Sequence, residues 1–67
     1  MNIVLNNREE RIEQDNLTMN QLIQYKNFTF RLLVTKLNGN LVKKDQRDEF
    51  IIQDGDHVEI MHLISGG

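Results

Sequence analysis

The last three residues of the sequence, Ser65, Gly66 and Gly67, are the group whose types and spacing best suit a chemical role. Two glycines carry no side chains, so we expect the end of the chain to be a slim, flexible arm that finishes in a carboxylate. A partner enzyme with a narrow tunnel can admit such an arm, because only backbone has to fit. We therefore predict that Gly67 carries the reactive group and that Ser65 and Gly66 thread it into the partner. A frayed end without function is the plain alternative.

Length, composition and charge exclude several other classes of protein. The 67 residues predict a single domain spanning 1–67, near the size at which an unaided core becomes marginal. The chain has no cysteine, so it can form neither a disulfide nor a thiolate metal site. A net charge of −2 gives no general attraction to nucleic acid or anionic lipid. Without an apparent membrane span or signal peptide, we expect a soluble, cytoplasmic protein that is monomeric when free.

The remaining polar side chains are weaker candidates for a site. His57 and His62 are too few for a metal site without cysteine, and on a strand their spacing points them to opposite faces. Glu9, Glu10 and Glu13 are expected on a solvated hairpin face rather than as an acid–base pair. A small basic cluster surrounds a predicted turn and comprises Lys36, Lys43, Lys44 and Arg47. Nearby acidic residues dilute this cluster, so nucleic-acid binding is not predicted.

The first half of the chain predicts a hairpin followed by a helix. Residues 1–5 alternate as a strand, and an Asn-Asn turn leads back through residues 10–12 as a short second strand. Thr18 and Gln21 have the spacing of a capping box. Apolar residues then recur at helical spacing, which predicts a helix over 19–27.

The second half predicts three strands that end at the glycines. Residues 32–37 favour a strand, and Asn38-Gly39 is a strong signal for a two-residue hairpin turn that returns residues 41–42 antiparallel. An Asp-Gly-Asp turn at 54–56 leads into the last strand, residues 58–64. Before that turn, three apolar residues are expected to bring the chain back to the core: Phe50, Ile51 and Ile52.

Alternation along the last strand predicts a surface for a partner. Val58 and Ile60 are expected to point inward, which leaves Met61 and Leu63 on the outer face. If the first and last strands are neighbours, Val4 joins them on the same open surface. Exposed apolar residues near a functional arm indicate a docking patch, so Val4, Met61 and Leu63 are predicted to bind partners. Singly exposed apolar residues without function are the alternative.

The expected order of elements is strand, strand, helix, then three strands, which predicts an α+β fold. It would be a mixed, mostly antiparallel sheet of about five strands covered by one helix. With this order the whole chain resembles the ubiquitin-like β-grasp proteins, and more narrowly the ThiS family of sulfur carriers of thiamine biosynthesis. The segments that carry the resemblance are Met1–Asn6, Leu17-Thr18 with Leu22-Ile23, Leu37–Gly39 with Leu41-Val42, Ile52–Asp56, Val58–Ile60 and Gly66-Gly67.

The resemblance implies a carrier rather than an enzyme. In such proteins an adenylating, ThiF-like enzyme consumes ATP to activate the terminal carboxylate, here that of Gly67. A persulfide sulfur drawn from cysteine then replaces AMP, and the resulting thiocarboxylate gives its sulfur to a ThiG-like thiazole synthase. The resemblance thus implies no bound cofactor, no metal and no catalytic residue in the chain itself.

The chain departs from the family pattern at several positions. Lys43 and Arg47 stand where members often have proline and tryptophan, and Ser65 replaces a common alanine. The connection around Phe28–Arg31 is also unusual, so no family residue is assigned there. Three alternatives use the same fold: the small subunit of molybdopterin synthase, a protein modifier joined to lysine through Gly67, and an interaction module without terminal chemistry. The first of these is usually longer and has prolines before its glycines, whereas this chain has none.

Overall fold

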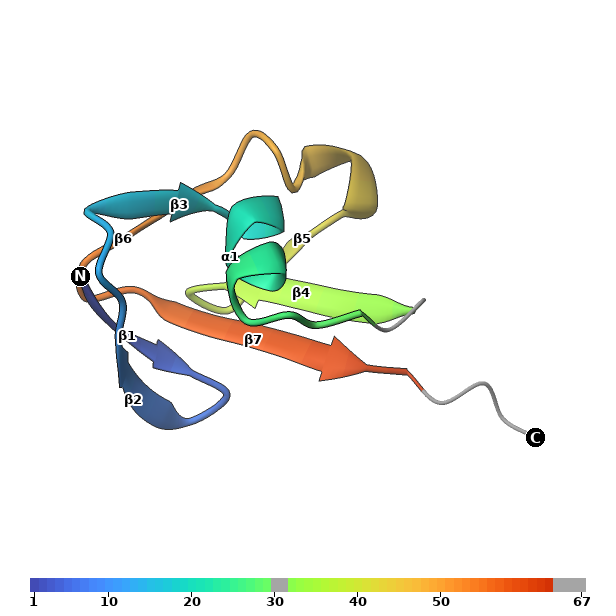
Figure 1. The fold of residues 1–67 in the computed structure, drawn as a ribbon. Coiled ribbons are helices and arrows are strands. Elements are labelled where there is room, and N and C mark those ends of the chain that lie inside the picture. Colours follow the sequence, from blue (N-terminus) through green and yellow to red (C-terminus); the bar gives the residue numbers. More distant parts are fainter. Residues whose placement is uncertain (30–31, 64–67) are drawn as a thin grey trace.

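The computed structural model describes residues 1–29 and 32–63, and its centre is a five-stranded sheet in the order β2-β1-β7-β4-β5 (Figure 1). The strands are β1 (Asn2–Leu5), β2 (Arg8–Arg11), β4 (Leu33–Leu37), β5 (Asn40–Val42) and β7 (His57–His62). Strands β1 and β7 run parallel, and the other neighbours run antiparallel. One helix, α1 (Met19–Tyr25), lies over one face. The mixed five-stranded sheet with one helix is confirmed, as is the pairing of the first strand with the last.

A second, two-stranded sheet was not predicted from the sequence. It pairs β3 (Asn16–Thr18) with β6 (Ile51–Gln53), and a short 3₁₀ turn, η1 (Lys44–Gln46), precedes β6. Strands of three residues are too short to show a period. The prediction that Ile51 joins the core is wrong: Ile52 is fully buried, and alternation turns Ile51 outward, where it is 50% exposed.

Helix α1 begins where the sequence predicted, and it ends early. The Gln21 amide donates to Thr18 Oγ1 at 3.1 Å, and the Thr18 amide donates to Gln21 Oε1 at 2.9 Å, which is the expected capping box. The helix stops at Tyr25 rather than Asn27. Asn27 takes a left-handed backbone with φ +58°, and that conformation cannot continue a right-handed helix.

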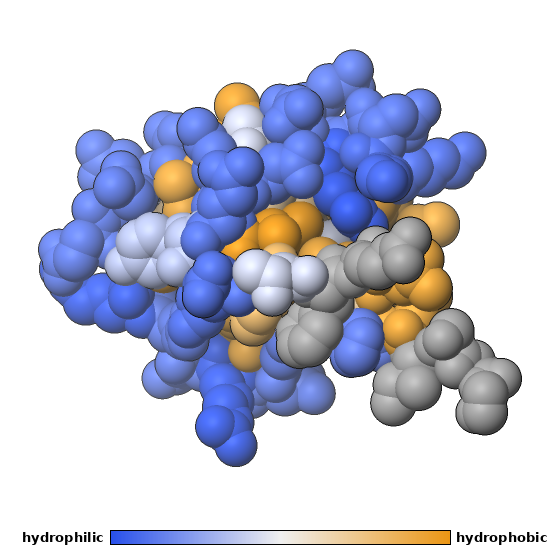
Figure 2. Space-filling view, turned by 45° about the vertical axis from the view of Figure 1, so that its right-hand side comes forward, coloured by the Kyte–Doolittle hydropathy of each residue, from blue (hydrophilic) through white to orange (hydrophobic). Residues whose placement is uncertain are grey.

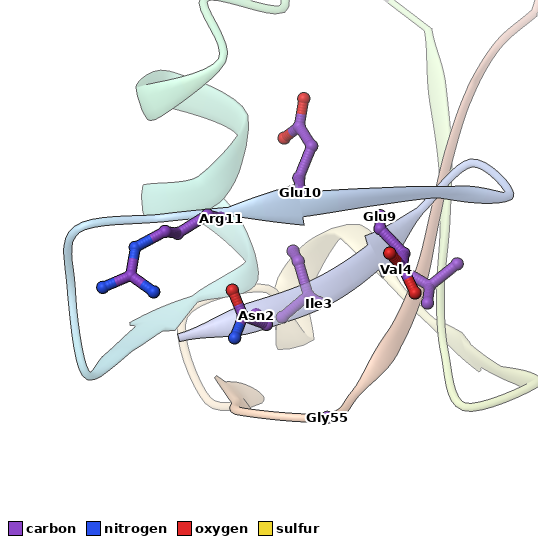
Figure 3. A pocket seen from close by; sticks show the side chains of 7 residues that line it. All are labelled: Asn2, Ile3, Val4, Glu9, Glu10, Arg11 and Gly55. Atoms are coloured by element: carbon purple, nitrogen blue, oxygen red, sulfur yellow. The ribbon is translucent and has the colours of Figure 1, made fainter.

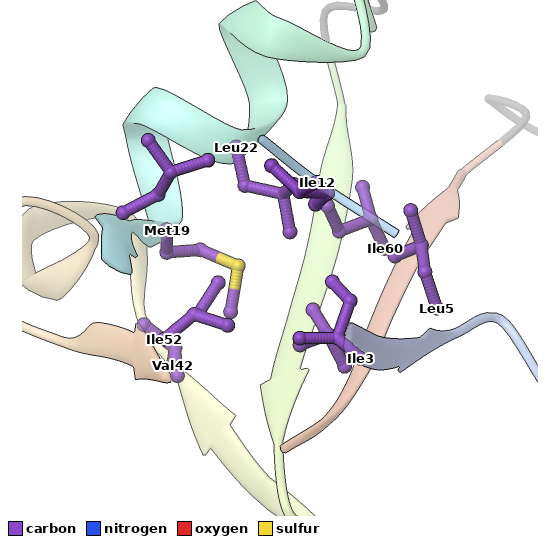
Figure 4. Close-up of a cluster of buried hydrophobic side chains, with 10 residues drawn as sticks. Ile3, Leu5, Ile12, Met19, Leu22, Val42, Ile52 and Ile60 are labelled. Atoms are coloured by element: carbon purple, nitrogen blue, oxygen red, sulfur yellow. The ribbon is translucent and has the colours of Figure 1, made fainter. Parts of the chain in front are cut away.

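The core lies between α1 and the sheet face that the helix covers, which we call the inner face (Figure 4). Met19 and Leu22 project from the helix into a cluster of apolar side chains that includes Ile3 from β1, Ile52 from β6 and Ile60 from β7. The buried apolar residues are Ile3, Leu5, Ile12, Leu17, Met19, Leu22, Val42, Ile52, Val58 and Ile60. Val58 and Ile60 therefore point inward, as predicted. No helix within residues 1–29 and 32–63 has the length and apolar character to span a membrane.

Arg47 supports the half of β4 that β5 does not cover. Strand β5 pairs with Thr35–Leu37 only, and Arg47 Nη2 donates to the carbonyl of Leu33 at 2.7 Å. Arg47 Nε also donates to Thr35 Oγ1 at 3.2 Å, while that buried hydroxyl donates to the Val42 carbonyl at 2.6 Å. The guanidinium therefore takes the place of a strand partner, and this use of Arg47 was not anticipated from its place in the basic cluster.

We expect Arg47→Met to lower the free energy of unfolding by about 2 kcal/mol, because hydrogen bonds from a charged donor are lost while the apolar stem is kept. Urea denaturation followed by circular dichroism measures the change. Lys44→Met, at an exposed position of η1, is the control and should stay within about 0.5 kcal/mol of the wild type. Equal stabilities for both variants would show that the Arg47 contacts contribute nothing.

Candidate functional site

Strand β7 is the element that leads to the predicted reactive terminus. It lies between β1 and β4, so both of its edges are occupied by neighbours over part of its length. Met61 is 41% exposed and Leu63 is 50% exposed, as alternation predicted for the outer face, opposite α1. Ser65, Gly66 and Gly67 lie outside the described residues, so their predicted role rests on the sequence.

An apolar surface lies beside the end of β7. Met61 is the register partner of Val34 on β4, and the Leu63 amide donates to the Leu32 carbonyl at 3.0 Å. We define the β4–β7 patch as Leu32, Val34, Met61 and Leu63. Figure 2 shows hydrophobic surface at the end of the sheet where β4 begins and β7 ends. The patch thus lies beside the end of β7, from which the chain continues to its glycines.

Val4 lies on the same outer face, but it is too far from Met61 to form one continuous patch with it. Its register partner on β7 is His57, and Met61 is two outward positions further along that strand. Val4 instead lines a hollow of about 580 Å³ on the β1–β2 hairpin, where it lies beside Glu9 (Figure 3). The other lining residues are Asn2, Ile3, Glu10, Arg11 and Gly55. The structure therefore brings Met61 and Leu63 together and leaves Val4 at the opposite end of β7.

Charged residues border the β4–β7 patch on the outer face. Lys36 and Glu59 are register partners one outward position from Val34 and Met61. Leu41, the register partner of Lys36 on β5, is 57% exposed. An apolar centre with a mixed-charge border is typical of a surface that binds protein rather than nucleic acid.

One further pair of charged residues, Glu10 and Lys26, serves the fold. Glu10 projects from β2 toward the α1 side and forms an ion pair with Lys26 at the end of the helix (Figure 3). This contact separates Glu10 from Glu9, which supports the expectation that they are not an acid–base pair. The prediction that Glu10 lies on a solvated face is wrong, because its side chain turns toward the helix and is only 30% exposed. Among residues 1–29 and 32–63, no three His, Cys, Asp or Glu side chains come close enough to hold a metal ion.

Sequence reasoning missed Leu32 and Val34 as members of the patch. The strand over residues 32–37 was predicted, and its alternation would have placed Leu32 and Val34 on the face opposite Thr35. What the sequence lacked was the register, because only the pairing of Val34 with Met61 shows that these residues adjoin the end of β7.

A family model supplies the decisive comparison, since the ThiS family matches residues 2–67. The chain belongs to the ThiS family. A crystal structure of the thiamine biosynthesis protein ThiS from Geobacter metallireducens has the same fold, with a TM-score of 0.89, 23% identity and complete coverage of both chains. An NMR structure of a thiamine biosynthesis protein from the same organism has a TM-score of 0.83 at 23% identity and covers 100% of this chain and 88% of the other. No curated protein matches the chain.

Membership of the ThiS family confirms the resemblance and, with the solved structures, the β-grasp fold. The family consists of small carrier proteins, which supports a sulfur-carrier role rather than an enzymatic one. It also implies interaction with enzymes of the thiamine pathway.

Proposed function

We propose that this protein carries sulfur as a thiocarboxylate on Gly67 and donates it to a thiazole synthase in thiamine biosynthesis. The observation that carries the proposal is the ThiS family match over residues 2–67, which includes the terminal Gly66-Gly67. The β4–β7 patch at the end of β7 supports it, because it offers a binding surface beside the strand that leads to those glycines.

The chemistry starts from a poor electrophile, because the charge of a carboxylate is delocalised. A carboxylate oxygen of Gly67 attacks the α-phosphorus of ATP, a C–O–P anhydride forms, and pyrophosphate leaves. A cysteine persulfide then attacks the acyl carbon, so that a C–S bond forms and AMP leaves. A thiol finally cleaves the S–S bond of this acyl disulfide, which releases the Gly67 thiocarboxylate and a new disulfide. ATP, the persulfide and the thiol are supplied by partners.

The length of the segment between β7 and Gly67 limits how far the active site of a partner can lie from the sheet. Gly67 follows His62, the last residue of β7, by five positions in the sequence. Five extended residues span at most about 18 Å. A partner must therefore bind the sheet within that distance of its own reactive site, and the β4–β7 patch is an apolar surface that lies within this range. We propose that the adenylating enzyme and the thiazole synthase both dock there, in turn.

Intact-mass spectrometry tests the proposal. The protein is incubated with a ThiF-like adenylating enzyme, ATP and a cysteine desulfurase that supplies the persulfide. We expect a mass increase equal to the exchange of one oxygen for sulfur, localised to Gly67 by fragmentation, and no change when ATP is omitted. An unchanged mass with an adenylating enzyme that activates its own carrier would contradict the carrier function.

The same sample separates the thiazole role from the alternatives. Addition of a ThiG-like thiazole synthase with its other substrates should return the carrier to its original mass and place the sulfur in the thiazole product. Consumption of the thiocarboxylate by the large subunit of molybdopterin synthase alone would instead assign the small-subunit role. Attachment of Gly67 to a lysine would assign the modifier role.

A further inference from the structure

Asn6 makes an unusual contact with the last part of β7. Its side-chain Nδ2 donates to the carbonyl of Ile60 at 3.1 Å, and its Oδ1 accepts from the Ile60 amide at 2.8 Å. One side chain thus binds both backbone groups of one strand residue. Ile60 immediately precedes Met61, a member of the β4–β7 patch.

The contact lies where β1 stops and β7 continues. The parallel pairing of these strands has the register Val4 to His57 and Leu5 to Val58, and the Asn6 amide donates to the Val58 carbonyl at 2.9 Å. Beyond this point the chain turns into the β1–β2 hairpin, because Asn6 takes a left-handed backbone with φ +52°. Strand β7 runs on to His62. The side-chain amide of Asn6 therefore takes the place of the backbone group that one more residue of β1 would have offered to β7.

This position requires a hydrogen-bond donor, a hydrogen-bond acceptor and a left-handed backbone, and asparagine meets all three requirements. A primary amide offers a donor and an acceptor with the chemistry of a peptide group, whereas an ionised aspartate offers acceptors only. Asparagine also tolerates the left-handed backbone better than most residues. Glycine would tolerate that backbone but has no amide to bind Ile60. The turn alone would accept several residues, so the double contact is the more demanding requirement.

We propose that Asn6 is a positioning residue, which fixes the direction in which β7 delivers the terminal glycines to the adenylating enzyme. This inference rests on the proposed function. With the contact, β7 is held on its β1 side to Ile60 and on its β4 side to His62. Without it, the β1 side is held only to Val58. The pairing with β4 would keep Met61 and Leu63 beside Leu32 and Val34, so the patch would stay intact, but the paired ends of β4 and β7 would be held less firmly against the rest of the sheet.

The test compares Asn6→Gly with Asn7→Gly. Asn7 is the matched control: it has the same residue type in the same turn, with φ +67°, and it makes no side-chain hydrogen bond within the described residues. Amide hydrogen exchange at Ile60 reports the contact. ATP–pyrophosphate exchange with a ThiF-like enzyme, at varied carrier concentration, reports kcat and KM for adenylation.

For Asn6→Gly we expect faster exchange at the Ile60 amide and a kcat for adenylation about tenfold lower, because reactions depend steeply on the placement of the reacting group. The KM for the carrier should stay within about twofold, since docking through the patch is retained. Asn7→Gly should match the wild type in all three measurements. A loss of stability alone would lower the amount of folded carrier and so would not separate kcat from KM in this way.

Asn6→Asp covers the case in which Asn6→Gly fails to fold. It keeps the size and the acceptor for the Ile60 amide, but it faces the Ile60 carbonyl with a carboxylate, so kcat should again fall with KM retained. A wild-type kcat in either Asn6 variant, once it is shown to be folded, would overturn the positioning role alone. No adenylation of the wild type, by an enzyme active on its own carrier, would overturn the proposed function and the positioning role together.

Discussion

Deletion of Gly67 is expected to abolish thiocarboxylate formation while the domain stays folded. The new terminal carboxylate, on Gly66, would lie one residue short, which is about 3.5 Å along an extended chain. A misplacement of about 1 Å can already cost a factor of 100 in rate, so we expect conversion to fall by more than that. Intact-mass spectrometry after incubation with the adenylating enzyme, ATP and the persulfide source measures the loss.

A chain extended by one glycine after Gly67 is the comparison for length. It keeps both native glycines and moves the carboxylate too far, so it should fail as the deletion does. Melting temperatures of both variants should match the wild type, because the deleted or added residue lies beyond the buried residues of β7. A large fall in melting temperature would mean that the terminus packs on the domain, and then the tunnel-threading model would be wrong.

Met61→Asp is expected to weaken binding to both the adenylating enzyme and the thiazole synthase by about 30-fold, which corresponds to about 2 kcal/mol for a central interface residue. The physical reason is the burial of an unpaired charge against apolar surface. Stability should fall by only about 1 kcal/mol, because Met61 is 41% exposed in the free protein. Titration calorimetry with each partner measures the affinities.

Ile51→Asp is the matched control for this surface. Ile51 is also a half-exposed apolar residue on a strand, but it lies in the second sheet, outside the β4–β7 patch. We expect it to bind both partners normally. If both variants bind normally, the patch is not the docking surface. In a competition experiment with the wild type, each partner should displace the other, since one patch serves both.

The pattern of single elements predicted most of the fold. The capping box at Thr18 and the positive φ of Asn38 and Gly39 are local features, so the residues themselves specify them. The small sheet was missed because its partners, β3 and β6, are far apart in sequence and only three residues long. Pairing over that distance leaves no periodic signal in so short a strand.

In the candidate site too, local features could be predicted from the sequence, whereas contacts between distant strands could not. Alternation identified Met61 and Leu63 as outward, whereas the neighbours that turn them into a patch depend on the register between β4 and β7. The contacts of Arg47 and Asn6 were beyond sequence reasoning for another reason. Each places a polar side chain against the backbone of a distant strand, and nothing in residue type reveals that a strand edge is left open there.

The position of β7 has a consequence for how the chain acquires its shape. This strand follows all the others in sequence, yet it lies in the middle of the sheet and joins β1 to β4. During synthesis the earlier strands therefore cannot assemble into the complete sheet until β7 has left the ribosome. Contacts that link the two ends of a chain also slow folding, because distant segments must meet first. The glycines that follow β7 would consequently reach a partner only on a domain whose sheet has closed, so an incomplete chain would not be loaded with sulfur.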